Sequence, residues 1–362
     1  MIVKLENTVK KIKHKLGLDH SYAFVEKKVH YKLDQSDSQE KNIIFLLPDL
    51  NYPCGGNIVV HRLCEEINQS EIKGYKSYIL YPKAPTFKTK WFEHTAPHKE
   101  NLILNPATDF VIIPEMYAAE HGKLLKELNV PYAINVANGY LMDFEKKYSN
   151  FTYADICSAY ENANLLLAIS DDAVTNIELV FPVSPSKIIK SSYVIDKAKF
   201  RPIAQKKNII TYMPRKLANH VQTLLFFLSR HLPKHWELKA IDGVKEHEVY
   251  DIFSESKIFL SFSEFEGLAM PPAMAALSGN HVIGYTGEGN KEYFNLPCFT
   301  TINCGDIKQF IQEILHTIGL MDSEKYQFDM NALEALTYMF SEDKQHQYLS
   351  SLVERIDIER KR

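Results

Sequence analysis

The sequence has few cysteines, no long apolar run and no excess of one charge. Its five cysteines are odd in number and include no Cys-x-x-Cys pair, so neither a disulfide framework nor a cysteine zinc site is indicated. No apolar stretch approaches the roughly 20 residues that span a bilayer, and lysines stand where a signal peptide needs its apolar segment. The 42 basic and 45 acidic residues give a formal net charge of -3, which provides no field for binding nucleic acid. We therefore expect a soluble, cytoplasmic protein with no nucleic-acid partner.

Several catalytic motifs are absent as well. The sequence has no Gly-x-Ser-x-Gly, no His-Glu-x-x-His and no Gly-x-x-x-x-Gly-Lys, so hydrolase, zinc protease and nucleoside triphosphatase activities lack support. No Asp-x-Asp triplet is present either, which argues against a diphosphate held through a carboxylate-bound metal. We expect neither a catalytic metal nor a cofactor.

Residues 1–37 differ in pattern from the rest and predict an N-terminal amphipathic helical extension. Spacings of three and four place its apolar residues on one stripe of a helix, and these are Ile2, Leu5, Val9, Ile12 and Leu16. Lysines occupy the other faces. Such a helix could dock on its own domain, pair with a second copy as a homodimer, or make peripheral contact with the anionic inner face of the cell membrane.

Short apolar runs then alternate with amphipathic stretches, as in β-α-β units with a parallel sheet. A chain of 362 residues exceeds one average domain, and the pattern occurs twice. Residues 38–195 form the first predicted α/β domain, residues 196–340 the second, and residues 341–362 a C-terminal helix that crosses back to the first. The predicted strands are 43–47, 78–81, 110–113, 132–136, 165–169, 208–213, 238–241, 258–262 and 281–285. The segment 192–202 is the predicted linker, since its Arg201-Pro202 end disfavours regular structure.

The most informative stretch runs from Phe262 to Gly279. It reads as a buried strand, an acidic and glycine-containing turn, and a helix that begins at Pro271-Pro272. Such a turn directs backbone N–H groups and the positive end of the helix dipole at a ligand above it, which suits a phosphate or a sugar hydroxyl. Glu266 at its mouth would accept hydrogen bonds from hydroxyl groups. A purely structural turn remains the alternative.

These residues carry a resemblance to a known family. Glu266-Gly-Leu-Ala-Met-Pro-Pro272, followed by Ala275-Ala276 and Gly279, resembles the donor-site signature of GT-B glycosyltransferases, particularly the retaining family 4 type found in bacterial capsule and lipopolysaccharide biosynthesis. The likeness covers most of the chain from residue 42. Gly55-Gly56 with Gly74 is similar to the family's first glycine loop, and the segment 193–202 is similar to its interdomain linker. Gly284 to Gly289 with Glu292-Tyr-Phe294 is similar to its strand and loop after the motif.

The resemblance implies two Rossmann-like doubly wound domains that face a cleft, with the nucleotide diphosphate sugar bound by the second domain. Glu266 would hold hydroxyls of the donor sugar, and Arg215 and Lys216 would neutralise the departing diphosphate. The amides near Gly267, Leu268, Ala269 and Met270 would face the diphosphate and sugar. A solvated basic pair at a strand end is the alternative for Arg215 and Lys216, and their spacing departs from the usual pattern of the family.

A second departure lies at Met274, where the family usually has a glutamate that binds both ribose hydroxyls. Methionine accepts hydrogen bonds only weakly. Either the donor contains a deoxyribose, as a thymidine diphosphate sugar does, or the site has decayed. The first hypothesis predicts tighter binding of thymidine diphosphate than of uridine diphosphate.

The remaining candidates lie at other predicted strand ends, where an open parallel sheet binds its ligands. Asp242 and Gly243 follow a strand of the second domain and would receive the nucleobase, although a structural turn explains them equally well. Acceptor or sugar contacts are expected in the first domain at Gly55, Gly56, Glu115, Asn138 and Tyr140. Asn138-Gly139 also fits an ordinary turn. His61 is more typical of a surface or packing residue than of a catalytic base.

The sequence therefore predicts a metal-independent hexosyltransferase. It would move a hexose or deoxyhexose from a nucleotide diphosphate sugar to a hydroxyl of a growing surface glycan, either free or lipid-linked. Retention is implied by the resemblance alone. Two rivals remain. A non-catalytic homologue that binds glycans or supports a partner would fit Met274, whereas a nucleotide-sugar epimerase would need an acid/base pair that the sequence does not offer.

Overall fold

The computed structural model describes residues 29–52, 54–70, 72–203 and 205–361. The helix expected over residues 2–16 lies outside these residues. The end of the predicted helical extension is not helical: β1 (Lys32–Leu33) pairs in parallel with β4 (Ile103–Leu104). The cause is burial, because Val29 and Tyr31 enter the core while the two β1 residues are exposed. The extension is therefore wrong for residues 29–37.

The first sheet has six parallel strands in the order β3-β2-β5-β6-β7-β8. Alternate residues of β2 face opposite sides: Ile43 and Phe45 pack with α2, while Ile44 and Leu46 pack in the core that contains α3, α5 and α6. The bounds are β2 (Lys41–Leu46), β3 (Tyr75–Leu80), β5 (Asp109–Pro114), β6 (Tyr132–Val136), β7 (Leu165–Ala168), β8 (Ile188–Lys190), α2 (Gly55–Gln69), α3 (Ala118–Glu127), α4 (Phe144–Tyr148), α5 (Tyr153–Asn162) and α6 (Asp171–Val180).

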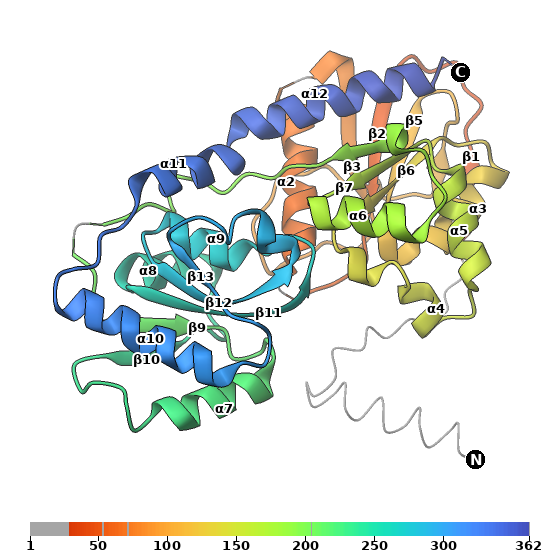
Figure 1. The fold of residues 1–362 in the computed structure, drawn as a ribbon. Helices are drawn as coiled ribbons and strands as arrows, with labels where there is room; N and C mark the ends of the chain where they lie inside the picture. The colour runs from red at the N-terminus through yellow and green to blue at the C-terminus, as the bar shows by residue number, and fades with distance from the viewer. Residues whose placement is uncertain (1–28, 53, 71, 204, 362) are drawn as a thin grey trace.

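The second sheet has five parallel strands in the order β10-β9-β11-β12-β13. Helices α7 and α10 pack on one face, and α8 and α9 pack on the other. The bounds are β9 (Ile209–Tyr212), β10 (Glu237–Ala240), β11 (Ile258–Glu266), β12 (His281–Glu288), β13 (Phe299–Thr301), α7 (Ala218–Leu228), α8 (Glu246–Glu255), α9 (Met270–Leu277) and α10 (Ile307–Asp322). Helices thus cover both faces of both sheets, and the two lobes lie beside each other (Figure 1).

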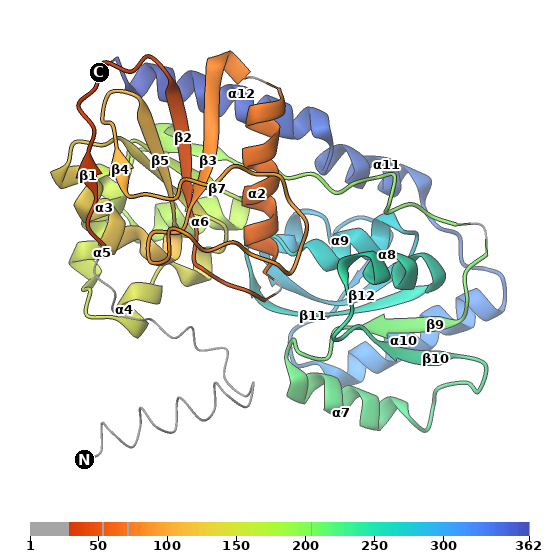
Figure 2. The same cartoon turned by 180° about the vertical axis from the view of Figure 1, so that it is seen from behind.

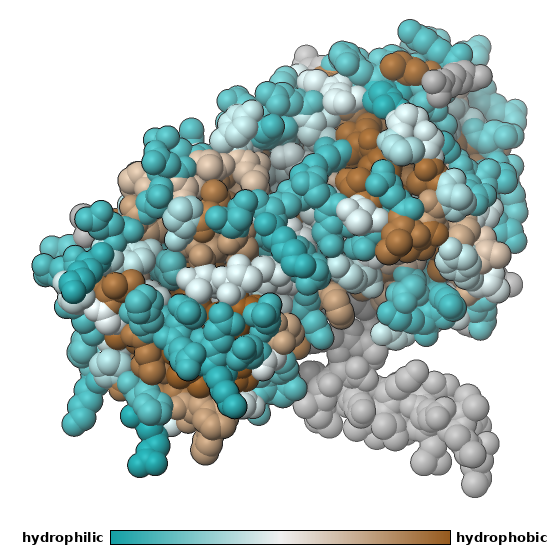
Figure 3. Space-filling view, in the orientation of Figure 1, coloured by the Kyte–Doolittle hydropathy of each residue, from teal (hydrophilic) through white to brown (hydrophobic). Residues whose placement is uncertain are grey.

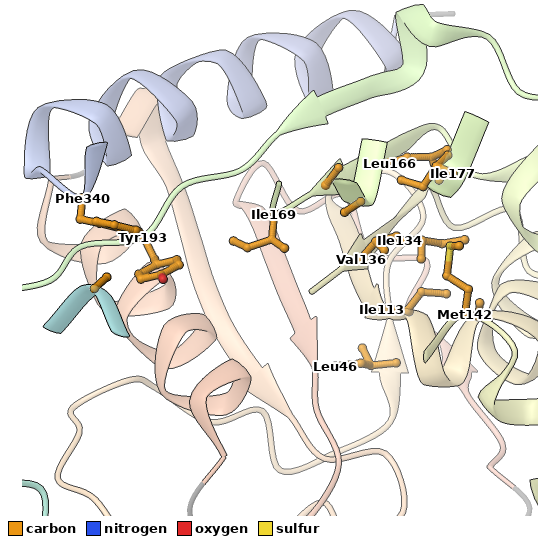
Figure 4. Packing of buried hydrophobic residues seen from close by; sticks show 14 of the residues in the cluster. Leu46, Ile113, Ile134, Val136, Met142, Leu166, Ile169, Ile177, Tyr193 and Phe340 are labelled. Carbon is orange, nitrogen blue, oxygen red and sulfur yellow. The ribbon is translucent and has the colours of Figure 1, made fainter. Parts of the chain in front are cut away.

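Two crossings join the lobes. The chain leaves β8 and reaches β9 through a segment whose Tyr193 ring lies beside that of Phe340 (Figure 4), with ring centroids 5.0 Å apart. The second crossing consists of α11 (Met330–Met339), which packs against α9, and α12 (Glu342–Glu359), which runs back along the first lobe (Figures 1 and 2). Helix α12 inserts apolar residues into the core around α2, and Lys41 pairs with Asp357 at 2.8 Å. The inserted residues are Tyr348, Leu349, Leu352, Val353 and Ile356.

Hydrophilic side chains cover most of the face drawn in Figure 3, with smaller hydrophobic groups between them. Within the described parts of the chain, every helix is too short or too polar to cross a bilayer.

Candidate functional site

The carboxyl ends of the two sheets meet where the lobes touch. Asn138, just after β6, donates from its side-chain nitrogen to the carbonyl oxygen of Phe265 in β11 at 2.9 Å. The rings of Tyr140 and Phe265 stack with centroids 4.7 Å apart. A Cβ atom on Gly267 would lie 1.9 Å from the carbonyl oxygen of Ala137, so only glycine permits this approach. Strand ends of both lobes therefore contribute to one site.

The basic pair predicted from the sequence reaches this site. It lies in the turn between β9 and α7, and Lys216 forms an ion pair with Glu266. Arg215 pairs with Asp242 at 3.1 Å. The Glu266 side chain is 21% exposed and that of Lys216 is 56% exposed. Glu266 is thus neither sealed in the core nor fully solvated, and a cation is held against it.

The turn after Glu266 is fixed by contacts from both lobes. Tyr293 donates to the carbonyl of Ala269 at 2.8 Å, and Tyr193 donates to that of Leu268 at 3.3 Å. The Ala269 amide donates to the Asn290 side-chain oxygen at 2.6 Å. Ala269 was expected to offer its amide to a ligand, so this expectation is wrong: the amide already has a partner at the N-cap of α9. The amides of Gly267, Leu268 and Met270 remain the candidates.

The end of β12 and the short helical turn that follows it pack against this turn. A Cβ on Gly289 would lie 1.7 Å from the Gly267 carbonyl oxygen, and Gly287 has a φ of +61° with Ser263 close by. Glu288 has φ 70° and ψ -69°, a sparsely populated conformation for a residue with a side chain. Backbone strain at Glu288 thus lies next to the Glu266 turn.

The first lobe presents the start of α2 to the same place. A Cβ on Gly55 would touch the sulfur of Met270 at 3.6 Å, so the first turns of α2 and α9 are neighbours. Gly56 has open space around its Cα, with no heavy atom within 4 Å of an added Cβ. Two helix N-termini therefore converge beside the Lys216–Glu266 pair, which favours negative charge there.

Glu115 and Asn138 hold the first-lobe side together. Glu115 is buried and accepts hydrogen bonds from the amides of Asn138 at 3.0 Å and Ala137 at 3.4 Å. Burial raises the pKa of Glu115 to about 7. Asn138 accepts from the Tyr140 amide at 3.0 Å, so its side chain caps a short 3₁₀ turn as well as reaching Phe265. Both side chains are engaged by protein atoms, which makes them supports of the site.

The residues predicted to read the nucleotide occupy the second lobe. Asp242 is exposed beside Arg215, and Gly243 has a φ of +65° that suits the turn after β10. Met274 lies on α9 and packs, partly buried, against the core. Its environment is apolar, and its sulfur is a weak acceptor in the place expected for a carboxylate.

Two residues at this junction were not predicted as contacts. Glu292 reaches across the lobes to Lys190 at 2.8 Å and accepts from the Asp171 amide. Asn290 is fully buried and fixes Ala269. The available signal was the Gly-rich segment that precedes them, because glycines mark a close approach whose partners the sequence does not specify.

Comparison with known proteins gives a consistent picture. No family model matches the chain. An α-1,6-glucosyltransferase of Actinobacillus pleuropneumoniae serotype 7 is 31% identical over 126 residues, which cover 33% of this chain and 38% of that protein. The match therefore spans well under half of the relative's length.

Solved structures match over most of the chain. Sucrose-phosphate synthase of Thermosynechococcus elongatus superposes with a TM-score of 0.67 at 11% identity, covering 88% of this chain and all of that one. HepE of Anabaena in complex with UDP superposes with a TM-score of 0.64 at 11% identity. The match covers 87% of this chain and all of HepE. The lipopolysaccharide outer core galactosyltransferase WaaB superposes with a TM-score of 0.54 at 12% identity. The match covers 86% of this chain and 99% of WaaB. The predicted class of two Rossmann-like domains is confirmed, and the chain has the GT-B fold of glycosyltransferases.

Proposed function

We propose that the protein is a glycosyltransferase that uses a nucleotide diphosphate sugar. The observation that carries the proposal is the Lys216–Glu266 pair at the junction of the lobes, at the carboxyl end of β11 and beside the start of α9. Support comes from the glucosyltransferase relative and from HepE, whose structures contain UDP, or UDP and glucose. This pair places a carboxylate that could bind sugar hydroxyls, Glu266, next to a cation that could bind a diphosphate, Lys216.

The second lobe would bind the donor. Glu266 accepts hydrogen bonds from the sugar, which orients its anomeric carbon toward the acceptor. Lys216 and Arg215 neutralise the negative charge that grows on the leaving diphosphate, aided by the dipole of α9. Cationic side chains would thus provide the charge stabilisation without a metal. Retention of the anomeric configuration is part of the proposal and follows from the family resemblance alone.

The first lobe would bind the acceptor, a hydroxyl of a growing surface glycan such as capsule or lipopolysaccharide. Gly56 at the start of α2 leaves room for it, next to Gly55, which lies against Met270. Tyr140 adds an aromatic ring, stacked on Phe265, on which a sugar could pack. WaaB, a lipopolysaccharide outer core galactosyltransferase, has the same fold and supports this acceptor class.

A lipid-linked acceptor would place the protein at a membrane surface. The segment 2–16, with its apolar stripe and its lysines, would supply that peripheral contact. Binding to anionic vesicles that disappears on deletion of residues 2–16 supports this. If the deletion leaves vesicle binding unchanged, the contact is elsewhere.

Met274 bears on the nucleotide. We infer a deoxyribose donor, because α9 provides an apolar side chain where two ribose hydroxyls would need a carboxylate. A ligand that binds the folded state raises the melting temperature with its occupancy. Thymidine diphosphate should raise it more than uridine diphosphate at equal concentration, and the reverse order would refute the inference.

The experiment that tests the proposed function is incubation with a panel of nucleotide sugars. Release of nucleoside diphosphate is measured with and without glycan acceptors. Acceptor-dependent release supports a transferase, whereas conversion of the sugar without release indicates an epimerase. Binding of glycan with no turnover of any donor would indicate a non-catalytic homologue and overturn the proposal.

A further inference from the structure

Three histidines from distant parts of the sequence meet inside the first lobe. His61 lies on α2, and His94 and His98 lie in the long loop between β3 and β4. Each offers one ring nitrogen, and the three nitrogens all lie within 4.8 Å of one another. The ring centroids of His61 and His94 are 4.5 Å apart, and those of His94 and His98 are 5.3 Å apart. The cluster lies outside the donor and acceptor residues described above.

The hydrogen bonds of His61 define which of its two ring nitrogens could bind a metal. Its Nδ1 atom lies 2.7 Å from the carbonyl oxygen of Asn57. Because a carbonyl only accepts, Nδ1 carries the proton and Nε2 carries the lone pair. Metal-binding histidines typically donate their other ring N–H to such a carbonyl, which fixes the tautomer and the ring orientation. The Nε2 lone pair now accepts from the Tyr81 hydroxyl at 3.1 Å.

His94 and His98 have ring nitrogens that lack partners although they are buried. Nδ1 of His94 and both nitrogens of His98 are shielded from solvent and make no hydrogen bond. Leaving buried polar atoms unpaired costs free energy, so such a group calls for a ligand. The unpartnered nitrogens of both loop histidines, grouped with a nitrogen of His61, point to one shared ligand.

We propose that His61, His94 and His98 form a zinc site that fastens the β3–β4 loop to α2. Neutral imidazole suits zinc among the common divalent ions, and three histidines leave one position of a tetrahedron for water. Bond lengths of about 2.1 Å require nitrogens about 3.4 Å apart, so the rings must approach by about an ångström. His94 and His98 lie in a loop that has no helix or strand, apart from an isolated bridge at His98. Such a loop can move by that distance.

The neighbouring residues already guide the loop to this position. Glu65, one turn after His61, accepts hydrogen bonds from the backbone and side chain of Thr95, which lies between the two loop histidines. Its other oxygen accepts from Arg62 at 2.8 Å, so both oxygens are engaged. Among the described residues, the ligand atoms that lie within 4.8 Å of one another here belong to the three histidines.

The same loop supports the segment that leads to the acceptor-side glycines. The amide of Lys90 donates to the side-chain oxygen of Asn51 at 3.1 Å, a few residues before Gly55. Loops this long without regular structure are uncommon in compact domains and are usually functional or mobile. A metal that closes the loop would make it rigid and would stabilise the start of α2. The role is structural, so it does not depend on the proposed transferase activity.

The test uses the full chain with its purification tag removed, stripped with a chelator, dialysed and then titrated with zinc. We expect one equivalent of zinc by mass spectrometry and a rise in melting temperature of about 5 °C at saturation. Cobalt in place of zinc should give the intense visible absorption of a tetrahedral site. Retention of no zinc, with an unchanged melting temperature, would overturn the proposal.

Matched variants locate the site. His94→Gln and His98→Gln should each lower zinc affinity at least tenfold, whereas His316→Ala, at an exposed histidine of α10, should not. Circular dichroism of the zinc-free variants verifies folding, and the cobalt spectrum of the unaltered chain gives a readout that needs no variant. Equal zinc binding by all of these proteins would show that the ion lies elsewhere and would refute the assignment.

Discussion

Glu115 and Glu266 stand at the carboxyl ends of strands in facing sheets, yet their surroundings are opposite. Glu115 is buried, and its oxygens accept from the backbone amides of Ala137 and Asn138. Glu266 is partly exposed and pairs with Lys216. The first carboxyl has used its hydrogen-bonding capacity on its own lobe, whereas the second keeps a face for a ligand. Strand-end position alone therefore does not separate a supporting residue from a binding residue.

The difference extends to charge. Burial raises the pKa of Glu115 to about 7, so near neutral pH its carboxyl exchanges between the protonated and ionised forms. Glu266 instead lies against the Lys216 ammonium and is partly open to solvent, where a sugar hydroxyl could reach its carboxylate. If this comparison is correct, variants of Glu115 should alter stability and variants of Glu266 should alter turnover.

Replacing Glu115 by Gln should produce the largest change in stability. A carboxyl whose pKa is raised by folding favours the folded state most below its unfolded pKa near 4.5, and the benefit is lost as the pH rises through about 7. The free energy of unfolding of the original protein should thus fall by about 2 to 3 kcal/mol relative to Glu115→Gln between pH 5 and pH 8. Urea titrations at several pH values measure this. Parallel curves would contradict the buried, protonated carboxyl.

Replacing Glu266 by Ala should reduce turnover at least a hundredfold, which is about 2.7 kcal/mol of barrier. The side chain is partly exposed and its ion pair contributes little to folding, so the melting temperature should change only slightly. Glu264→Ala, at an exposed residue of the same strand, is the matched control. Near-normal turnover in Glu266→Ala would show that this carboxylate does not bind the sugar.

Gly267→Ala tests whether the two lobes depend on their close contact. The added Cβ would overlap the Ala137 carbonyl, which forces the backbone to move at a cost of about 2 kcal/mol and displaces the turn. Gly319→Ala, within α10 and with no atom within 4 Å, should instead raise stability by about 0.5 kcal/mol or more. Thermal unfolding compares them, and equal stabilities would argue against contact at Gly267.

The smallest effect is expected for the ion pair between the lobes. Glu292→Gln removes the charge that faces Lys190, at a cost of about 1 kcal/mol or a few degrees in melting temperature. Asp143→Asn, which breaks an exposed pair with Lys147 inside one lobe, should have almost no effect. An equal loss in both variants would indicate that the junction gains nothing from its charge pair.

The strands with long apolar runs could be predicted from the sequence. The run 132–136 coincides with β6, because buried parallel strands are continuously apolar. β8 and β13 were missed: each has three residues, and their polar members, among them Lys190 and Thr301, interrupt the signal. β11 extends to Glu266, past the predicted end at residue 262, since its polar end pairs with β12.

The candidate site was predictable where a motif stands on one segment. Glu266 and Lys216 could be singled out because each follows an apolar run: Glu266 ends β11, and Lys216 lies in the turn after β9. The contact between Lys216 and Glu266 joins two separate segments of the sequence, as does the hydrogen bond between Asn290 and Ala269. The spacing of motifs along the sequence does not predict such contacts. His61 was judged as a single residue for the same reason, since its two neighbours stand more than 30 positions away.

The core of the first lobe is complete only after the ribosome has synthesised helix α12, near the C-terminal end of the sequence. Lys41 and its partner Asp357 are 316 residues apart, so a ribosome that adds about 5 to 20 residues per second needs tens of seconds between them. During that time the α2 side of the first sheet lacks the cover that Leu349, Leu352 and Val353 provide. Nascent chains should therefore expose an aggregation-prone apolar surface. Chains that end before residue 342 should aggregate or remain bound to chaperones.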